Sequence, residues 1–237
     1  MKIVTVQFRY PHRSNYDLLL QVFKYSCHVH MPDVELVDIK IPPPKAIHGK
    51  DLNFAYNTVK LELWLDYLEN TDEEVIFADC DMLAIKSAKH AFDIDFDVAF
   101  TGRTVVNRIP MNGGIMMARP TEAARRFFRE MMFVNNLMLE NITFHNQWRR
   151  KYAGMNQAAF GYTYERGAHR AKVHEYKTLE WNAVDCDWHR INGQTVFIHY
   201  KSKLRKTVLR EIKMKPELVN VAKIWDDMKS RMLQENQ

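Results

Sequence analysis

The stretch that most constrains the fold is Val75–Ala78, four consecutive apolar residues (VIFA) that run directly into two acids. A short, continuously apolar run indicates a strand that is buried on both faces, as in a parallel sheet. Before it, residues 2–8 and 34–39 have the composition of strands, and residues 16–28 and 54–68 have the apolar spacing of helices. This alternation of strand and helix predicts an α/β domain.

The sequence patterns that predict helices and strands are weaker further along the chain. Pro120, Thr121 and Glu122 are favourable residues for a helix start, and they predict a long helix that ends near Leu139. The stretch 141–187 is rich in aromatic and amide residues, and we expect it to be irregular. The other predicted elements are strands at 98–100, 114–118 and 196–198 and a closing helix at 216–233.

The formal net charge of +5 is unevenly distributed along the chain. Residues 1–118 carry 12 basic and 16 acidic side chains, whereas residues 119–237 carry 22 and 13. An anionic partner is therefore expected on the C-terminal half, and a diphosphate ligand would need only a few of these charges.

The sequence also bears on the compartment. No apolar run approaches the ~20 residues that span a bilayer, and Gln7 and Arg9 interrupt the first strand too early for a signal peptide. The three cysteines lack metal-binding spacing, so we expect reduced thiols in a soluble, cytoplasmic protein without a transmembrane segment.

Asp79 and Asp81 follow the buried strand directly. In an extended chain residues i and i+2 point the same way, so the two carboxylates can converge while Cys80 faces the opposite side. Two carboxylates this close repel each other unless a cation lies between them. Their hard oxygen ligands favour Mn²⁺ or Mg²⁺, and ligands of open α/β sheets bind at the carboxyl ends of the strands. These acids are therefore a candidate metal site.

The same tripeptide, DCD, recurs at Asp185 and Asp187. No apolar strand precedes this copy, and Arg190 follows it closely. We expect these acids to cap a turn or to pair with nearby arginines rather than to hold a metal.

A single DxD motif is weak evidence for a metal site, so other residues must supply the remaining ligands. His199 follows a predicted strand, and its imidazole is a candidate third metal ligand. The cations after it can hold a diphosphate and stabilise it as a leaving group. These cations are Lys201, Lys203, Arg205, Lys206 and Arg210.

Two amide-containing stretches are further candidates. Asn112-Gly113-Gly114 predicts a tight turn into a strand, where the backbone can approach a ligand closely. Asn156-Gln157 predicts the start of a helix, and these amides could either contact sugar hydroxyls or cap the helix.

Taken together, the strand with its DxD, the NGG, the NQ and the late histidine followed by cations resemble the GT-A glycosyltransferases, most nearly the retaining family-eight type. The resemblance implies a GT-A fold with a Rossmann-like mixed sheet, a UDP-sugar donor and Mn²⁺. The sequence shows no linker, so we expect one domain over residues 1–237, in which the resemblance implies a nucleotide-binding lobe at 1–105 and an acceptor-side lobe at 106–237.

The resemblance assigns roles to particular positions. Asp79, Asp81 and His199 fall on the metal ligands, and Asp79, Asp81, Asn156 and Gln157 on the catalytic positions. The family has glycine three residues after the histidine and lysine six after it, where this chain has Ser202 and Arg205, and its acid before the glutamine is Asn156 here. The implied nucleotide-binding residues are Phe8, Tyr10, Lys60, Asp79, Cys80, Asn112, Gly113, Gly114, Lys203 and Arg205.

The expected activity is metal-dependent transfer of a sugar from a nucleotide-sugar to an acceptor hydroxyl, with retention. An inverting enzyme would instead need a base, for which Glu165, Asp185 or Asp187 could serve. The charge of the C-terminal half fits a polyanionic acceptor such as a lipopolysaccharide core, another glycan or a modified DNA base, and equally a merely solvated surface.

Three other protein classes remain as alternatives. A haloacid-dehalogenase-like phosphatase also carries a DxD, but normally after its first strand and with Thr or Val where this chain has Met82. A sugar nucleotidyltransferase usually has a glycine-rich loop after its first strand, whereas residues 7–16 contain no glycine. A non-catalytic protein could use the same fold to bind nucleic acid or glycan through its basic half, with salt-dependent DNA binding as its signature.

Overall fold

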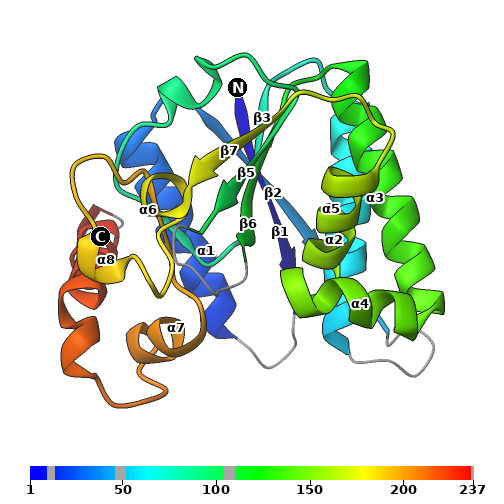
Figure 1. Cartoon of the computed structure of the whole chain (residues 1–237). Coiled ribbons are helices and arrows are strands. Elements are labelled where there is room, and N and C mark those ends of the chain that lie inside the picture. Colours follow the sequence, from blue (N-terminus) through cyan, green and yellow to red (C-terminus); the bar gives the residue numbers. More distant parts are fainter. Residues whose placement is uncertain (10–13, 46–51, 104–109, 236–237) are drawn as a thin grey trace.

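A six-stranded mixed sheet runs through the centre of the computed structural model, which describes residues 1–9, 14–45, 52–103 and 110–235 (Figure 1). The strands are β1 (Lys2–Phe8), β2 (Glu35–Ile41), β3 (Val75–Ala78), β4 (Met82–Ala84), β5 (Val98–Gly102), β6 (Met111–Ala118), β7 (Val173–Lys177) and β8 (Phe197–His199). The order in the large sheet is β2-β1-β3-β6-β5-β7, and β4 and β8 form a separate two-stranded sheet. β6 is antiparallel to its neighbours β3 and β5, and the other pairs in the large sheet are parallel.

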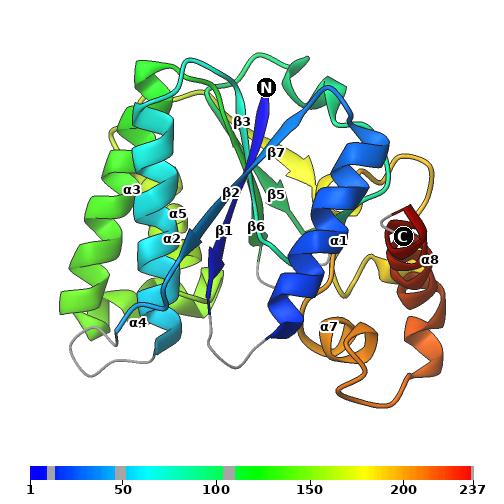
Figure 2. The same ribbon diagram turned by 180° about the vertical axis from the view of Figure 1, so that it is seen from behind.

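Helices cover both faces of the sheet (Figures 1 and 2). They are α1 (Ser14–His30), α2 (Leu52–Glu69), α3 (Glu122–Glu140), α4 (Ile142–Tyr152), α5 (Asn156–Arg166), α6 (Thr178–Trp181), α7 (Ser202–Val208) and α8 (Val219–Glu235), with short 3₁₀ helices at Lys89–Phe92, Trp188–Arg190 and Pro216–Leu218. α2, α3 and α5 lie on one side of the sheet, and α1, α7 and α8 on the other. The structure thus confirms the predicted α/β class.

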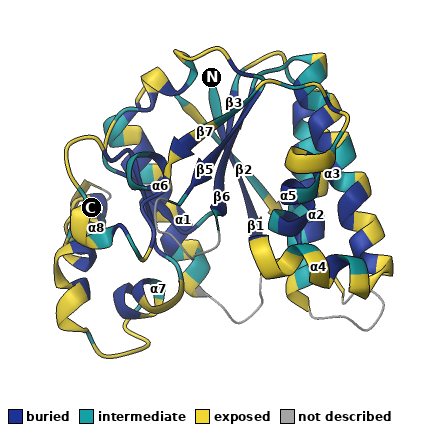
Figure 3. Ribbon diagram, in the orientation of Figure 1, coloured by how far each residue is buried: buried dark blue, intermediate teal, exposed yellow. Residues whose placement is uncertain are grey.

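Alternation of side chains along the strands builds two cores. Phe77 points to the side of α2 and α3, where it stacks on Trp64 at 5.1 Å between ring centroids. Its neighbour Ile76 points to the other side, where it packs with Phe23 of α1. Every residue of Val75–Ala78 is buried, because both faces of the strand are covered, whereas the edge strands β2 and β7 are more exposed (Figure 3).

The long helix predicted after residue 120 is present as α3. Thr121 is its N-cap, and its hydroxyl accepts a hydrogen bond from the Ala124 amide at 3.1 Å, while Glu122 lies in the first turn. The closing helix is also present, as Pro216–Leu218 followed by α8.

The prediction that residues 141–187 are irregular is wrong. This stretch forms α4, α5, β7 and α6, and of these only the start of α5 at Asn156 was predicted. Its helices bury aromatic and small side chains instead of an aliphatic stripe: Tyr152 of α4 is buried against Gly161 of α5, where any Cβ would lie 2.2 Å from the tyrosine ring. Aromatic residues therefore form the apolar faces of α4 and α5, and they do so without the aliphatic periodicity by which helices are usually predicted.

The last predicted strand is present as β8, but it lies outside the large sheet. It pairs antiparallel with β4, a three-residue strand that the sequence analysis did not predict. The register places Met82 opposite His199, and the Tyr200 amide donates to the Asp81 carbonyl at 2.8 Å. This small sheet joins the two segments that carry the acids and the late histidine.

Within the described ranges, none of the helices has the length and apolar character needed to cross a membrane.

Candidate functional site

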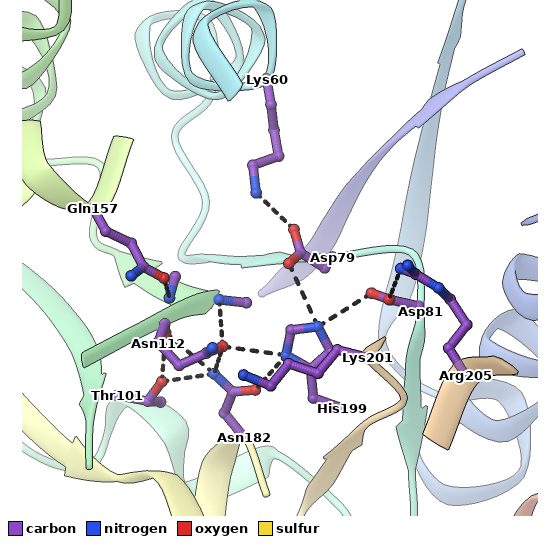
Figure 4. Close-up of polar contacts among 12 residues, drawn as sticks. Lys60, Asp79, Asp81, Thr101, Asn112, Gln157, Asn182, His199, Lys201 and Arg205 are labelled. Carbon is purple, nitrogen blue, oxygen red and sulfur yellow. Dashed lines mark hydrogen bonds and ion pairs between the residues drawn. The ribbon is translucent and has the colours of Figure 1, made fainter. Parts of the chain in front are cut away.

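Asp79, Asp81 and His199 come together at the carboxyl end of β3 (Figure 4). The His199 Nε2 atom lies 3.2 Å from Asp81 Oδ1 and 3.7 Å from Asp79 Oδ2. Asp81 and His199 are buried, whereas Asp79 is partly exposed. The sequence analysis treated the acids as extended chain. Instead, Asp79 precedes a turn formed by Cys80 and Asp81, and convergence of the two acids depends on this turn between β3 and β4.

The chemistry of these three side chains fits a divalent metal ion. Each offers one ligand atom, and the three atoms lie within 4.8 Å of one another. Two carboxylate oxygens and one imidazole nitrogen suit Mn²⁺ and Mg²⁺ better than a soft, thiolate-seeking metal. Among the described residues this is the group of acids, cysteines and histidines with such a geometry.

Two cations hold the outer oxygens of the acids. Lys60 of α2 donates to Asp79 Oδ1 at 2.7 Å, and Arg205 of α7 donates to Asp81 Oδ2 at 3.0 Å. Burial by itself raises the pKa of the Asp81 carboxyl, but His199 and Arg205 outweigh burial and hold that pKa below its usual value. Asp81 is therefore ionised at neutral pH and available as a ligand.

Asn112, Gly113 and Gly114 lie within β6 rather than in a turn before it, which corrects the sequence prediction. β5 pairs Phe100 with Met116 and the next residue with Asn112, so β6 bulges at the glycines. The bulge brings Gly114 against the imidazole: a Cβ at this position would lie 2.5 Å from His199 Nδ1. The glycine is thus needed for close approach to His199.

A cavity of about 370 Å³ opens beside the three candidate metal ligands. Of the residues implied by the resemblance, Phe8, Lys60, Cys80 and Arg205 line it, together with Asp79, Asp81 and His199. Cys80 lines the cavity and also packs against the core on the side of α1. Lys201, which was predicted as a phosphate-binding cation, also lines the cavity. The other lining residues were not predicted: Val6, Tyr16, Asn53, Tyr56, Asn57 and Ser202.

Two of the unpredicted cavity residues, Tyr16 and Tyr56, could have been identified from the sequence. Tyr16 lies at 5.1 Å from the Arg205 guanidinium, and Tyr56 packs on Phe8 at 4.7 Å between centroids. Both are aromatic residues near the start of a helix that follows a strand, which places them at the ligand-binding edge of an α/β sheet. Tyr10, the residue proposed for base stacking, lies outside the described residues.

Some predicted residues lie away from the cavity. Lys203 is exposed on α7 and does not line it. Asn156 is buried at the start of α5. Gln157 does not line the cavity either, but its Oε1 accepts from the Gly113 amide at 2.9 Å and its Nε2 donates to the Tyr152 carbonyl at 2.7 Å. Gln157 therefore connects α5 to the bulge of β6.

Backbone geometry marks one departure from the family pattern. Ser202, which stands where the family has glycine, has φ of 50°, in the left-handed region that favours glycine. Ser202 thus has a conformation that glycine adopts more readily than serine.

The second acid pair has the structural role that its surroundings predicted. The fully buried Asp187 accepts from the Val184 amide at 3.3 Å and from Arg190 at 2.9 Å, so it both caps a turn and pairs with an arginine. Asp185 pairs with Arg103 at 3.3 Å.

Glu165, the third possible base, is also engaged. It accepts hydrogen bonds from Tyr152 and from Lys151, the latter at 2.5 Å. Burial raises the pKa of Glu165, but these two partners outweigh burial and lower that pKa overall, which weakens the carboxylate as a base. Neither Glu165, Asp185 nor Asp187 lines the cavity.

Comparison with solved structures identifies the fold. No protein-family model matches the sequence, and no curated protein sequence matches it. The fold is nevertheless that of the GT-A glycosyltransferases, with a mostly parallel sheet flanked by helices, which confirms the predicted fold.

Three similar structures illustrate the likeness. A glycosyltransferase involved in glycosylation of the major capsid of PBCV-1 aligns over 90% of this chain and 98% of its own, with 12% identity and a TM-score of 0.59. The galactosyltransferase LgtC, in complex with donor and acceptor sugar analogs, aligns over 98% and 96%, with 13% identity and a TM-score of 0.59. The apo-form glycosyltransferase GlyE of Streptococcus pneumoniae TIGR4 aligns over 99% of this chain but 62% of its own, with 10% identity and a TM-score of 0.65. At these identities the likeness concerns the fold.

Proposed function

We propose that the protein is a metal-dependent glycosyltransferase that uses a nucleotide-diphosphate sugar, most simply a UDP-sugar. The observation that carries the proposal is the convergence of Asp79, Asp81 and His199 beside a cavity at the carboxyl ends of the strands. The GT-A fold supports it, because ligands of open α/β sheets bind at this edge.

The charges around the cavity suit a diphosphate. Lys60 and Arg205 balance the two aspartates, so a divalent cation adds two uncompensated positive charges. A diphosphate bridge carries two negative charges and restores the balance. Bound Mn²⁺ or Mg²⁺ would supply Lewis-acid stabilisation of the negative charge that develops on the leaving diphosphate.

The remaining residues of the cavity have separable tasks. Asp79, Asp81 and His199 would hold the cation, and Arg205 and Lys201 would donate to phosphate oxygens. Phe8, Tyr16 and Tyr56 offer aromatic surface to the nucleoside. We assign retention of configuration from the family resemblance. Asn156 and Gln157 lie outside the cavity, so we propose that they act by supporting β6 through the Gln157–Gly113 hydrogen bond.

We propose a polyanionic acceptor, because exposed basic side chains occur on both α4 and α7. α4 and α7 lie at the same edge of the molecule as the end of β1 (Figure 1). Arg149 lies 6.0 Å from the Phe54 ring, next to the cavity residue Asn53, and the exposed Arg150 follows it. Lys203 is exposed on α7. Binding of phosphorylated glycan or DNA that weakens steeply with salt would support this acceptor class, and salt-insensitive binding of neutral sugars would oppose it.

A donor screen tests the central proposal. Purified protein is incubated with a panel of UDP-, GDP- and ADP-sugars and Mn²⁺, with and without EDTA, and nucleotide release is followed together with inorganic phosphate. Slow release of UDP that EDTA abolishes, without inorganic phosphate, is the expected result. Calorimetry that detects no binding of any nucleotide-sugar in the presence of Mn²⁺ would contradict the proposal, and hydrolysis of a simple phosphate ester would favour the phosphatase alternative.

A further inference from the structure

A hydrogen-bonded group of three polar side chains lies behind His199, on the side away from the acids (Figure 4). Asn182 Oδ1 is 3.1 Å and Asn112 Oδ1 is 3.2 Å from His199 Nδ1. Asn182 Nδ2 in turn lies 2.8 Å from Thr101 Oγ1. Asn182, between α6 and β8, has no role in the assignments above. Neither it nor Thr101 lines the cavity.

Backbone groups fix the orientation of both amides. The Gly114 amide can only donate, and it lies 3.0 Å from Asn112 Oδ1, so that atom is an acceptor. The Asn112 carbonyl can only accept, and it lies 3.2 Å from Asn182 Nδ2, so the oxygen of Asn182 must face the imidazole. The Thr101 hydroxyl also donates to the Asn112 carbonyl at 2.9 Å, which leaves its lone pairs for Asn182 Nδ2.

These two oxygens determine which nitrogen of the neutral His199 imidazole carries the hydrogen. Both neighbours of Nδ1 are acceptors, so Nδ1 carries the hydrogen in the neutral imidazole and Nε2 carries the lone pair. Nε2 is the atom that faces Asp79 and Asp81. In its neutral form His199 therefore presents a nitrogen lone pair, rather than an N–H, to a cation that the two acids would hold.

Because the network is buried, it favours one orientation and one tautomer of the His199 imidazole. Asn182 and Thr101 are fully buried, and Asn112 and His199 are 6% and 4% exposed. Water therefore cannot readily replace a deleted amide, and loss of one partner leaves buried donors and acceptors unsatisfied. A rotated or tautomerised imidazole would have no equivalent set of partners.

We infer that Asn182 is a positioning residue that, supported by Thr101 and Asn112, sets His199 as a nitrogen ligand for the divalent cation. The inference rests on the proposed metal-dependent function. Groups that hold the far side of a metal-binding histidine typically change metal affinity 10–100-fold when they are removed. Asn182→Ala should therefore weaken Mn²⁺ binding by about that factor.

The experiment measures the dissociation constant of Mn²⁺ alone, from the EPR signal of the free ion, for the whole protein and its variants. Asn135→Ala is the matched control, because Asn135 is also a fully buried asparagine whose Nδ2 donates to a threonine hydroxyl, Thr58, at 2.9 Å. It joins α3 to α2, away from His199. Both variants should lose thermal stability, and only Asn182→Ala should lose Mn²⁺ affinity.

A double variant tests whether Asn182 acts through His199. In the His199→Ala background, Asn182→Ala should cause little further loss of Mn²⁺ affinity, because the ligand that it positions is gone. An undiminished loss in that background, or unchanged affinity in Asn182→Ala alone, would overturn the inference while leaving the proposed function intact. If the unmodified protein binds no Mn²⁺, the inference and the metal-dependent function fail together.

Discussion

The tripeptide Asp-Cys-Asp occurs twice in this chain, and its two copies have opposite roles. At Asp79 and Asp81 the carboxylates converge on His199 at the edge of a cavity. At Asp185 and Asp187 they are neutralised by arginines, and Asp187 also accepts a backbone amide. What the tripeptide does is therefore determined by the elements that surround it.

Two differences separate the copies. The first follows a buried strand, so it lies at the ligand-binding edge of a sheet, whereas the second lies between two short helices. The first also meets a distant segment, β8, which supplies the imidazole. In the second copy Asp187 is satisfied within its own stretch of chain, since it bonds to residues three positions away on either side, and Asp185 pairs with the distant Arg103.

The strongest test of this contrast is Asp81→Asn. The change keeps the shape of the side chain but removes a ligand charge, so donor turnover should fall on the order of 10³-fold, similar to the loss of a key electrostatic contact in other enzymes. The melting temperature should fall little, because relief of the repulsion between Asp79 and Asp81 offsets part of the lost pairing with Arg205. Mn²⁺-dependent UDP release and thermal melting measure the two effects. Turnover within a few-fold of the unmodified protein would contradict the assignment.

Gly114→Ala should have the next largest effect. The added Cβ would lie 2.5 Å from His199 Nδ1, so the imidazole must move away from its position between the acids and the asparagines. Mn²⁺ affinity should fall about 10–100-fold, as for loss of a group that orients a ligand.

Gly193→Ala is the control for that substitution, because Gly193 follows the second acid pair and an added Cβ there meets no atom within 4 Å. Mn²⁺ titration of both variants compares the two regions directly. Equal affinities for the two variants would show that the close packing at Gly114 is unimportant for the metal site.

Asp187→Asn should change stability rather than activity. The variant can still accept from the Val184 amide but loses the charge that pairs with Arg190, from a position that is fully buried. The free energy of unfolding should fall by about 1–3 kcal/mol, whereas turnover well below the melting temperature should be unchanged. Urea denaturation and the UDP-release assay check the two statements, and a large loss of turnover without loss of stability would assign the second copy to the active site.

The smallest effect is expected at Ser202. Because its φ is 50°, Ser202→Gly removes backbone strain but adds flexibility to the unfolded chain, so the free energy of unfolding should change by less than about 1 kcal/mol. Ser202→Val, with a branched side chain at the same φ, should destabilise by about 1–2 kcal/mol. Urea denaturation of both variants measures the difference. A valine variant as stable as the glycine variant would argue against strain at this position.

The sequence predicted much of the first half of the fold, because apolar periodicity there is strong. Val75–Ala78 is buried on both faces and has a continuously apolar sequence, and the helix α3 begins at its predicted cap. α4 was missed, and only the start of α5 at Asn156 was predicted, because their buried faces contain Tyr152, Gly161 and other residues that are also common in loops. β4 was missed because three residues are too few for a periodic pattern.

The candidate site was predicted in part for similar reasons. Asp79, Asp81 and His199 could be found from residue type and position after strands, but which cation reaches the acids depends on where α7 begins. Residues two apart lie on nearly opposite sides of a helix, so Arg205 contacts Asp81 while Lys203 faces solvent. No local sequence pattern identifies Asn182 and Thr101, because their hydrogen bonds form only when distant segments of the chain come together.

The pairing of β4 with β8 has a consequence for the order in which the protein matures. Met82 and His199 are cross-strand neighbours although 117 positions separate them along the chain. During synthesis the acids leave the ribosome long before the imidazole does, since chains emerge from the N-terminus onward. On the proposed function, a nascent chain would have only two of the three candidate metal ligands until the segment with His199 has been made, so high-affinity capture of the ion would wait for that segment.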